Sequence, residues 1–102
     1  MRFAVFGAGS FGTAVANSLA RRGLETVLWC RDPEQAQVIA SVHRNPRHLK
    51  GYGLAPSLEA TPDMAAALAM ASHVITAIPT QSLRDVLERV RGLPVEGKRF
   101  LS

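Results

Sequence analysis

Short apolar runs alternate with helical patterns along the whole chain. The runs at residues 3–6, 26–30 and 73–79 are nearly continuous, which is typical of strands covered on both faces of a parallel sheet. Weaker strand patterns cover residues 58–61 and 98–102. The intervening segments place apolar side chains at helical spacing, so helices are predicted before Gly23, over residues 33–43 and 64–71, and before Gly92.

Local signals mark the ends and the buried faces of these helices. The apolar face of the first helix is predicted to comprise Phe11, Ala14, Val15, Ser18 and Leu19. Gly23 suits a left-handed cap at its end. Asp32 is predicted to cap the second helix, with Pro33 at the first helical position and Gln35 completing a capping box. Thr61 is predicted to cap the third helix.

This order of elements predicts an α/β fold with a doubly wound parallel sheet, the Rossmann fold. Because crossovers between parallel strands are right-handed, the expected spatial order of the strands is 3-2-1-4-5. The 102 residues suit one domain, and the chain has no internal repeats. Ligands of such sheets bind beyond the carboxyl ends of the strands, where the winding reverses between the first and fourth strands.

A glycine pattern lies at that point of reversal. Gly7, Gly9 and Gly12 form G-x-G-x-x-G between the first strand and the first helix, the arrangement of a dinucleotide site. Gly7 would allow the tight turn, Gly9 the approach of a pyrophosphate, and Gly12 close packing of the helix. The helix would offer free N–H groups to the phosphates. A glycine-rich turn that binds nothing is the alternative reading.

The residue after the second strand bears on the choice of cofactor. Sites that prefer NAD carry an acid there to hold the ribose hydroxyls, but this strand ends at Cys30 and Arg31 follows. Arg31 could pair with a 2′-phosphate or stack on adenine, which favours NADP over NAD. Asp32 is the competing candidate as a displaced ribose-binding acid, although a capping role also explains it.

Two loops are further candidates for function. Residues 44–57 form a long loop, and its start is the most basic part of the chain, with His43, Arg44, Arg47, His48 and Lys50. This loop is either a flap over a bound anion or a solvated basic segment. No metal site is predicted. Pro79 ends the fourth strand, and residues 78–81 are expected to border the nicotinamide half of a cofactor.

Composition narrows the setting of the protein. The chain is 47% hydrophobic and 20% charged, with a net charge of +4. Its basic residues are dispersed and no run of them interleaves with aromatics, so an anionic small ligand is predicted rather than nucleic acid. No apolar run is long enough for a membrane span. The lone Cys30 is expected to be a buried packing residue, and a chain with one cysteine fits a reducing cytoplasm.

Several of these stretches resemble the N-terminal domain of bacterial NAD(P)-dependent glycerol-3-phosphate dehydrogenases. The matching blocks are Gly7–Ala14, Val27–Pro33, Arg44–Leu49 and Ala77–Arg84. The resemblance implies an enzyme that reduces dihydroxyacetone phosphate to sn-glycerol 3-phosphate for phospholipid synthesis. It implies that Ser10 and Phe11 contact the cofactor and Arg31 its adenosine end, and it is compatible with a homodimer of the full-length protein.

The resemblance also implies that this chain lacks the catalytic groups. Members of the family have roughly three times its length, in two domains. The family's catalytic lysines belong beyond Ser102, so no catalytic residue is assigned here and the chain alone is expected to be inactive. Residues 1–102 would then be an NAD(P)-binding domain truncated in its fifth strand. A stand-alone dinucleotide sensor and a related reductase, such as ketopantoate reductase, are the alternative functions.

Overall fold

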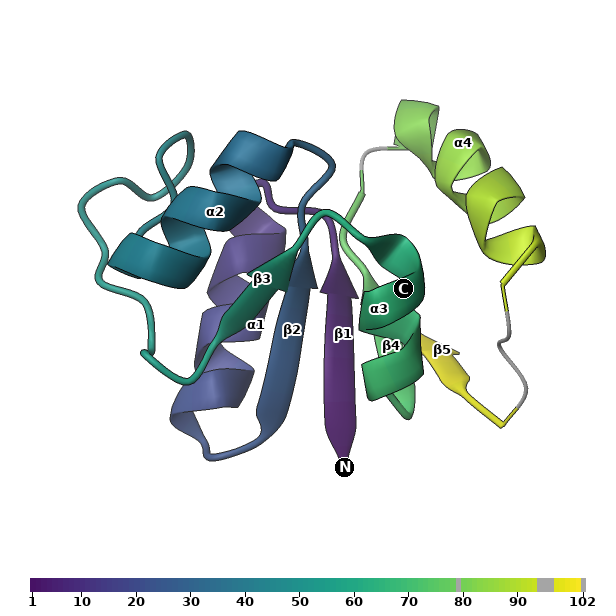
Figure 1. Cartoon of the computed structure of the whole chain (residues 1–102), viewed down its shortest axis with the longest axis horizontal. Coiled ribbons are helices and arrows are strands. Elements are labelled where there is room, and N and C mark those ends of the chain that lie inside the picture. Colours follow the sequence, from purple (N-terminus) through teal and green to yellow (C-terminus); the bar gives the residue numbers. More distant parts are fainter. Residues whose placement is uncertain (79, 94–96, 102) are drawn as a thin grey trace.

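Five parallel strands form one twisted sheet in the order β3-β2-β1-β4-β5, which confirms the predicted topology (Figure 1). The computed structural model describes residues 1–78, 80–93 and 97–101. The strands are β1 Arg2–Phe6, β2 Glu25–Trp29, β3 Glu59–Thr61, β4 His73–Thr76 and β5 Arg99–Leu101. The helices are α1 Ser10–Arg21, α2 Pro33–Val42, α3 Met64–Met70 and α4 Thr80–Arg91. No helix among the described residues is long and apolar enough to cross a membrane.

Helices cover both faces of the sheet, which is why its central strands can be apolar on both sides. On one face, Phe6, Trp29 and Val74 pack against α3 and α4. On the other face, Val5 and Leu28 pack against α1 and α2. In Figure 1 the arrowheads of β1 and β2 point the same way, and the connections to α1 and α2 leave from these carboxyl ends of the strands. These connections carry the candidate site.

The buried face predicted for α1 is only partly right: Val15 and Leu19 are half-buried and pack against the core, but the other three residues do not. Phe11 is 70% exposed, and Ala14 and Ser18 are also exposed. The residues of α1 that are buried are Gly12, Thr13, Ala16 and Ala20. The fully buried positions of α1 thus carry small side chains, as expected where a helix packs close to a sheet, whereas the large ring of Phe11 points outward.

The caps confirm some of the local predictions and correct others. Asp32 caps α2, since its carboxylate accepts from the N–H of Glu34 at 2.9 Å. Gly23 has φ +85° and follows α1 as predicted. For α3 the cap is Asp63, which accepts from Ala66 N, rather than Thr61. Thr61 is still part of β3, where it pairs with Trp29 and its carbonyl oxygen accepts from Cys30 N, so the helix begins after it.

Candidate phosphate turn and crevice

The glycine turn has the geometry that its spacing predicts. Gly7 has φ +115°, where a Cβ atom would lie 2.5 Å from the carbonyl oxygen of Ala77 in the neighbouring strand connection. A Cβ on Gly12 would lie 1.8 Å from the carbonyl oxygen of Gly7. These two positions therefore require glycine for folding. Among the described residues, nothing lies within 4 Å of a Cβ on Gly9, so this part of the chain leaves the space in front of Gly9 open.

The helix after the turn begins with donors that no side chain caps in the described part of the chain. Gly9 is the N-cap of α1, and the first turn carries no acidic residue. The N–H groups there and the positive end of the helix dipole suit an anion. An open hollow of about 460 Å³ lies in front of them, lined by Gly7, Gly9, Ser10, Phe11, Thr76, Ala77 and Ile78. The exposed ring of Phe11 therefore borders this hollow, although the sequence predicted it in the core.

A second hollow adjoins the first. It measures about 150 Å³ and is lined by Gly7, Trp29, Arg31, Ile78, Ser82 and Val86, so the two hollows share Gly7 and Ile78. Here Arg31 pairs with Asp85 of α4, across the crevice from β2. Both side chains are more than half exposed, at 55% and 62%, so this ion pair is weak and exchangeable. Arg31 thus lines this second hollow, and its contact with the adenosine end of a cofactor stays a prediction.

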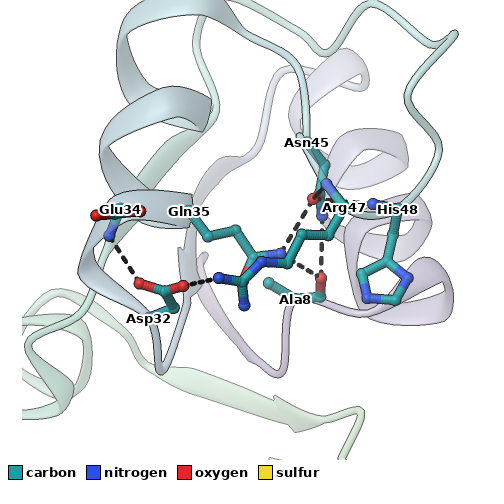
Figure 2. Close-up of polar contacts among 7 residues, drawn as sticks. All are labelled: Ala8, Asp32, Glu34, Gln35, Asn45, Arg47 and His48. Atoms are coloured by element: carbon teal, nitrogen blue, oxygen red, sulfur yellow. Dashed lines mark hydrogen bonds and ion pairs between the residues drawn. The ribbon is translucent and has the colours of Figure 1, made fainter.

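Both carboxylate oxygens of Asp32 have partners within the protein. One carboxylate oxygen caps α2, and the other pairs with the guanidinium of Arg47 from the basic loop. Figure 2 shows Asp32 between Glu34 and Arg47. The capping role predicted for Asp32 is thus confirmed, whereas a ribose-binding role stays a prediction.

Asn45 is the residue of this region that the sequence reasoning missed as a structural element. It is fully buried, and its Nδ2 donates to the carbonyl oxygen of Ala8 at 2.9 Å and to Thr13 Oγ1 at 2.8 Å. Its Oδ1 accepts from the N–H groups of Arg47 and His48 at 3.0 and 3.1 Å. The sequence signals were the Asn-Pro dipeptide, which marks a turn, and the Arg44–Leu49 block of the family resemblance, and neither says what Asn45 packs against.

Gln35 takes part in the same network instead of completing a capping box. Its Nε2 donates to Ala8 O and to Asn45 Oδ1, each at 3.0 Å, and its side chain is 6% exposed. The amide therefore points inward to the glycine turn, where both of its acceptors lie, and not back to the start of the helix. The basic loop is thus anchored at its start to the glycine turn.

The other residues of the loop divide between core and surface. Leu54, Ala55 and Leu58 are buried against α1 and α2, which holds the end of the loop. Nδ1 of His48 lies 3.4 Å from the hydroxyl oxygen of Ser10, the first residue of α1. Arg44 and Lys50 are not buried. The loop therefore has two packed ends and a basic middle beside the site.

Cys30 is buried at the end of β2, as predicted. Burial, with a smaller effect from the negative charge of Asp32, raises the pKa of this thiol to about 12. A thiol that stays protonated is a poor nucleophile and a packing group. Pro79 lies outside the described residues, as do the side chains of Thr80 and Gln81, so their predicted place beside the nicotinamide stays a prediction.

Comparison with known proteins agrees with this geometry. Residues 2–102 match the family described as NAD-dependent glycerol-3-phosphate dehydrogenase N-terminus. The chain is 48% identical over 99 residues to the glycerol-3-phosphate dehydrogenase (NAD(P)+) of Ectopseudomonas mendocina, covering 97% of this chain and 29% of that protein. The protein of the same name from Azotobacter vinelandii is 44% identical, with the same coverage.

A solved structure shares the fold. The crystal structure of glycerol-3-phosphate dehydrogenase from Coxiella burnetii superposes with a TM-score of 0.90 at 29% identity, and covers 97% of this chain and 30% of that one. The chain thus spans less than a third of the length of the relatives that it matches.

Proposed function

Because this chain belongs to the family of N-terminal domains of NAD-dependent glycerol-3-phosphate dehydrogenases, we propose that it binds and orients the nicotinamide dinucleotide of such an enzyme. The observation that carries the proposal is the turn from β1 to α1. There, Gly7 and Gly12 are needed for folding, whereas Gly9 faces open space beside the uncapped helix end. That division matches a turn built to admit a pyrophosphate.

The proposed reaction is the reduction of dihydroxyacetone phosphate to sn-glycerol 3-phosphate, for phospholipid synthesis. The nicotinamide supplies the hydride, and the domain described here supplies the binding and orientation of its carrier. The relatives carry glycerol-3-phosphate dehydrogenase in their names, and this supports the substrate assignment. No residue of this chain is proposed as catalytic.

The test uses the protein as its gene encodes it. Dihydroxyacetone phosphate should oxidise NADPH, followed by the loss of absorbance of the reduced nicotinamide, and ketopantoate should not. Gly9→Ala is expected to weaken binding of the dinucleotide at least about tenfold, since the added methyl group occupies the phosphate approach. A protein that binds neither NADPH nor NADH would overturn the proposal, and one that binds both without turnover would favour the sensor.

We further propose a preference for NADP, which rests on Arg31. Its guanidinium is exposed after the end of β2, where it pairs with Asp85. A 2′-phosphate carries a greater negative charge than this carboxylate, so the guanidinium can leave Asp85 and bind the phosphate instead. Arg31→Ala should weaken NADPH binding by about tenfold and NADH binding much less. Asp85→Asn is the matched control, because it frees Arg31 and should strengthen NADPH binding. An unchanged NADPH affinity in Arg31→Ala would contradict the preference.

The setting of the protein completes the proposal. A cytoplasmic location is supported by the single, buried and unpaired Cys30. The absence of nucleic-acid binding is supported by the dispersed basic residues. A homodimer is the proposed state of the full-length protein, and light scattering after size-exclusion chromatography tests it. An elution at the mass of one chain would contradict the dimer.

A further inference from the structure

The carbonyl group of Ala8, inside the glycine turn, is held by two side-chain amides from other segments. Gln35 Nε2, from α2, donates to it at 3.0 Å, and Asn45 Nδ2, from the start of the basic loop, donates at 2.9 Å. Figure 2 shows both amides converging on Ala8. Both donor residues are buried, which strengthens their hydrogen bonds to this oxygen.

The direction of this carbonyl determines the direction of the next N–H group. No peptide bond among the described residues is cis, so the C=O of Ala8 and the N–H of Gly9 point to opposite sides of one planar group. Since the oxygen is drawn inward to Gln35 and Asn45, the N–H of Gly9 points outward. Gly9 lines the hollow of about 460 Å³ in front of α1.

We propose that Asn45 and Gln35 are positioning residues: by holding the Ala8 carbonyl, they aim the Gly9 N–H at the phosphates of the dinucleotide. This inference rests on the proposed function and names residues that act on the site without touching the ligand. Without them the glycine on one side of this peptide would let it rotate, because glycine has few steric barriers. The two amides therefore restrict a peptide group that the glycine sequence alone would leave free to rotate.

Asn45 also joins the turn to the basic loop. Its Oδ1 accepts from the N–H groups of Arg47 and His48, while its Nδ2 holds Ala8. One buried side chain thus joins the glycine turn and the start of the basic loop in a single arrangement. A turn and a loop that are held by the protein's own hydrogen bonds lose less conformational entropy when a ligand binds.

Asn45→Asp separates the donor role from the acceptor role. The carboxylate keeps an acceptor for Arg47 N and His48 N, but it cannot donate to the Ala8 carbonyl, which accepts only. The Thr13 hydroxyl can reverse and donate to the carboxylate, so that contact survives. The expected result at about pH 8 is an affinity for ADP at least about tenfold weaker, with the affinity for adenosine nearly unchanged. Titration calorimetry on the protein as its gene encodes it measures both.

A pH profile distinguishes positioning from simple loss of stability. The neutral acid of Asn45→Asp has an O–H group that can donate to Ala8 O, and burial favours this neutral form. The ADP affinity of the variant relative to wild type should therefore recover as the pH falls to about 5. Thr13→Val is the matched control: it removes the other acceptor of Asn45 Nδ2, lies equally buried, and should leave the ratio of ADP to adenosine affinity unchanged.

The outcomes are separable. Wild-type protein that binds no dinucleotide refutes the proposed function. Wild-type binding together with equal losses for ADP and adenosine in Asn45→Asp, or with no loss at all, refutes the positioning role alone. If Asn45→Asp does not fold, Gln35→Met decides in the same way, since it removes one of the two donors to Ala8 and leaves Asn45 in place. It should show the same selectivity for ADP with a smaller loss.

Discussion

The three glycines of the turn differ in what keeps each position without a side chain. At Gly7 and Gly12 the neighbouring carbonyl oxygens would lie within 3 Å of a Cβ atom, which real structures do not allow. At Gly9 the space is open and φ is −77°, so the protein itself does not need glycine there. Each residue can therefore be assigned to folding or to binding by experiment.

Gly12→Ala and Gly9→Ala should separate stability from binding. Gly12→Ala should lower the free energy of unfolding by about 1–3 kcal/mol or more, because the methyl group pushes α1 away from the turn. Gly9→Ala should change it by less than about 1 kcal/mol, because its backbone suits alanine. Urea unfolding measures both variants. A larger stability loss in Gly9→Ala than in Gly12→Ala would contradict the geometry.

The raised pKa of the Cys30 thiol should make the stability of the protein depend on pH. Its pKa is raised from 9.0 to about 12 in the folded protein, mainly by burial. Below pH 9.0 the thiol is neutral in both states. Above it the unfolded chain releases the proton first, so the free energy of unfolding falls by up to about 1.4 kcal/mol per pH unit as the pH rises. Urea unfolding at several pH values gives the free energy of unfolding of wild type and of Cys30→Ala, and the difference between the two isolates the contribution of the thiol. The same pH dependence in both proteins would show that this contribution is absent.

At the scale of the element, the end of α1 depends on one backbone conformation. Gly23 N bonds to Ala20 O, and Leu24 N bonds to Leu19 O, the two hydrogen bonds of a Schellman cap. A Cβ atom on Gly23 would meet no residue that the structure describes within 4 Å, so within that part of the chain the positive φ alone opposes a side chain there.

Gly23→Ala should therefore lower the free energy of unfolding by about 1 kcal/mol, the strain of a left-handed alanine. Gly23→Asn should lower it less, since asparagine tolerates this region better. Both are measured by thermal or urea unfolding. Equal stability of the alanine variant and wild type would mean that the cap has opened or that the helix has shifted.

At the scale of the whole molecule, two apolar layers share one sheet. Ile39 of α2 is fully buried on one face, and Trp29 reports from the other face, where it contacts Phe6 and donates its Nε1–H to Pro62 O. A chain of this size is expected to unfold as one cooperative unit, so a change on one face should be felt on the other.

Ile39→Val should lower the free energy of unfolding by about 1 kcal/mol through a small cavity. The unfolding midpoint measured by Trp29 fluorescence and the one measured by far-ultraviolet circular dichroism should fall by the same amount, although Trp29 lies on the opposite face of the sheet. Val42→Ala, on the exposed end of the same helix, is the control and should change stability by less than about 0.5 kcal/mol. Separate midpoints for the two probes would show that the two layers unfold independently.

The sequence by itself determined the order of elements, the strand topology and the glycine turn. These follow from signals that neighbouring residues carry together: apolar runs, helical spacing, and glycines where a strand meets a helix. The Asp32 cap and the Gly23 cap belong to the same class, because each depends on residues within one turn of the helix end. Resemblance to relatives then indicated which dinucleotide enzyme uses such a turn.

Only the tertiary structure decided which face of α1 is buried, where the Gln35 amide points, and what Asn45 holds. Each depends on partners far along the chain: Asn45 meets Ala8 across 37 positions, and Gln35 meets it across 27. Hydrophobicity placed Phe11 in the core, but the fully buried positions of α1 carry small side chains. Hydrophobic pattern is local, whereas close packing and the satisfaction of a buried carbonyl are settled when distant segments meet.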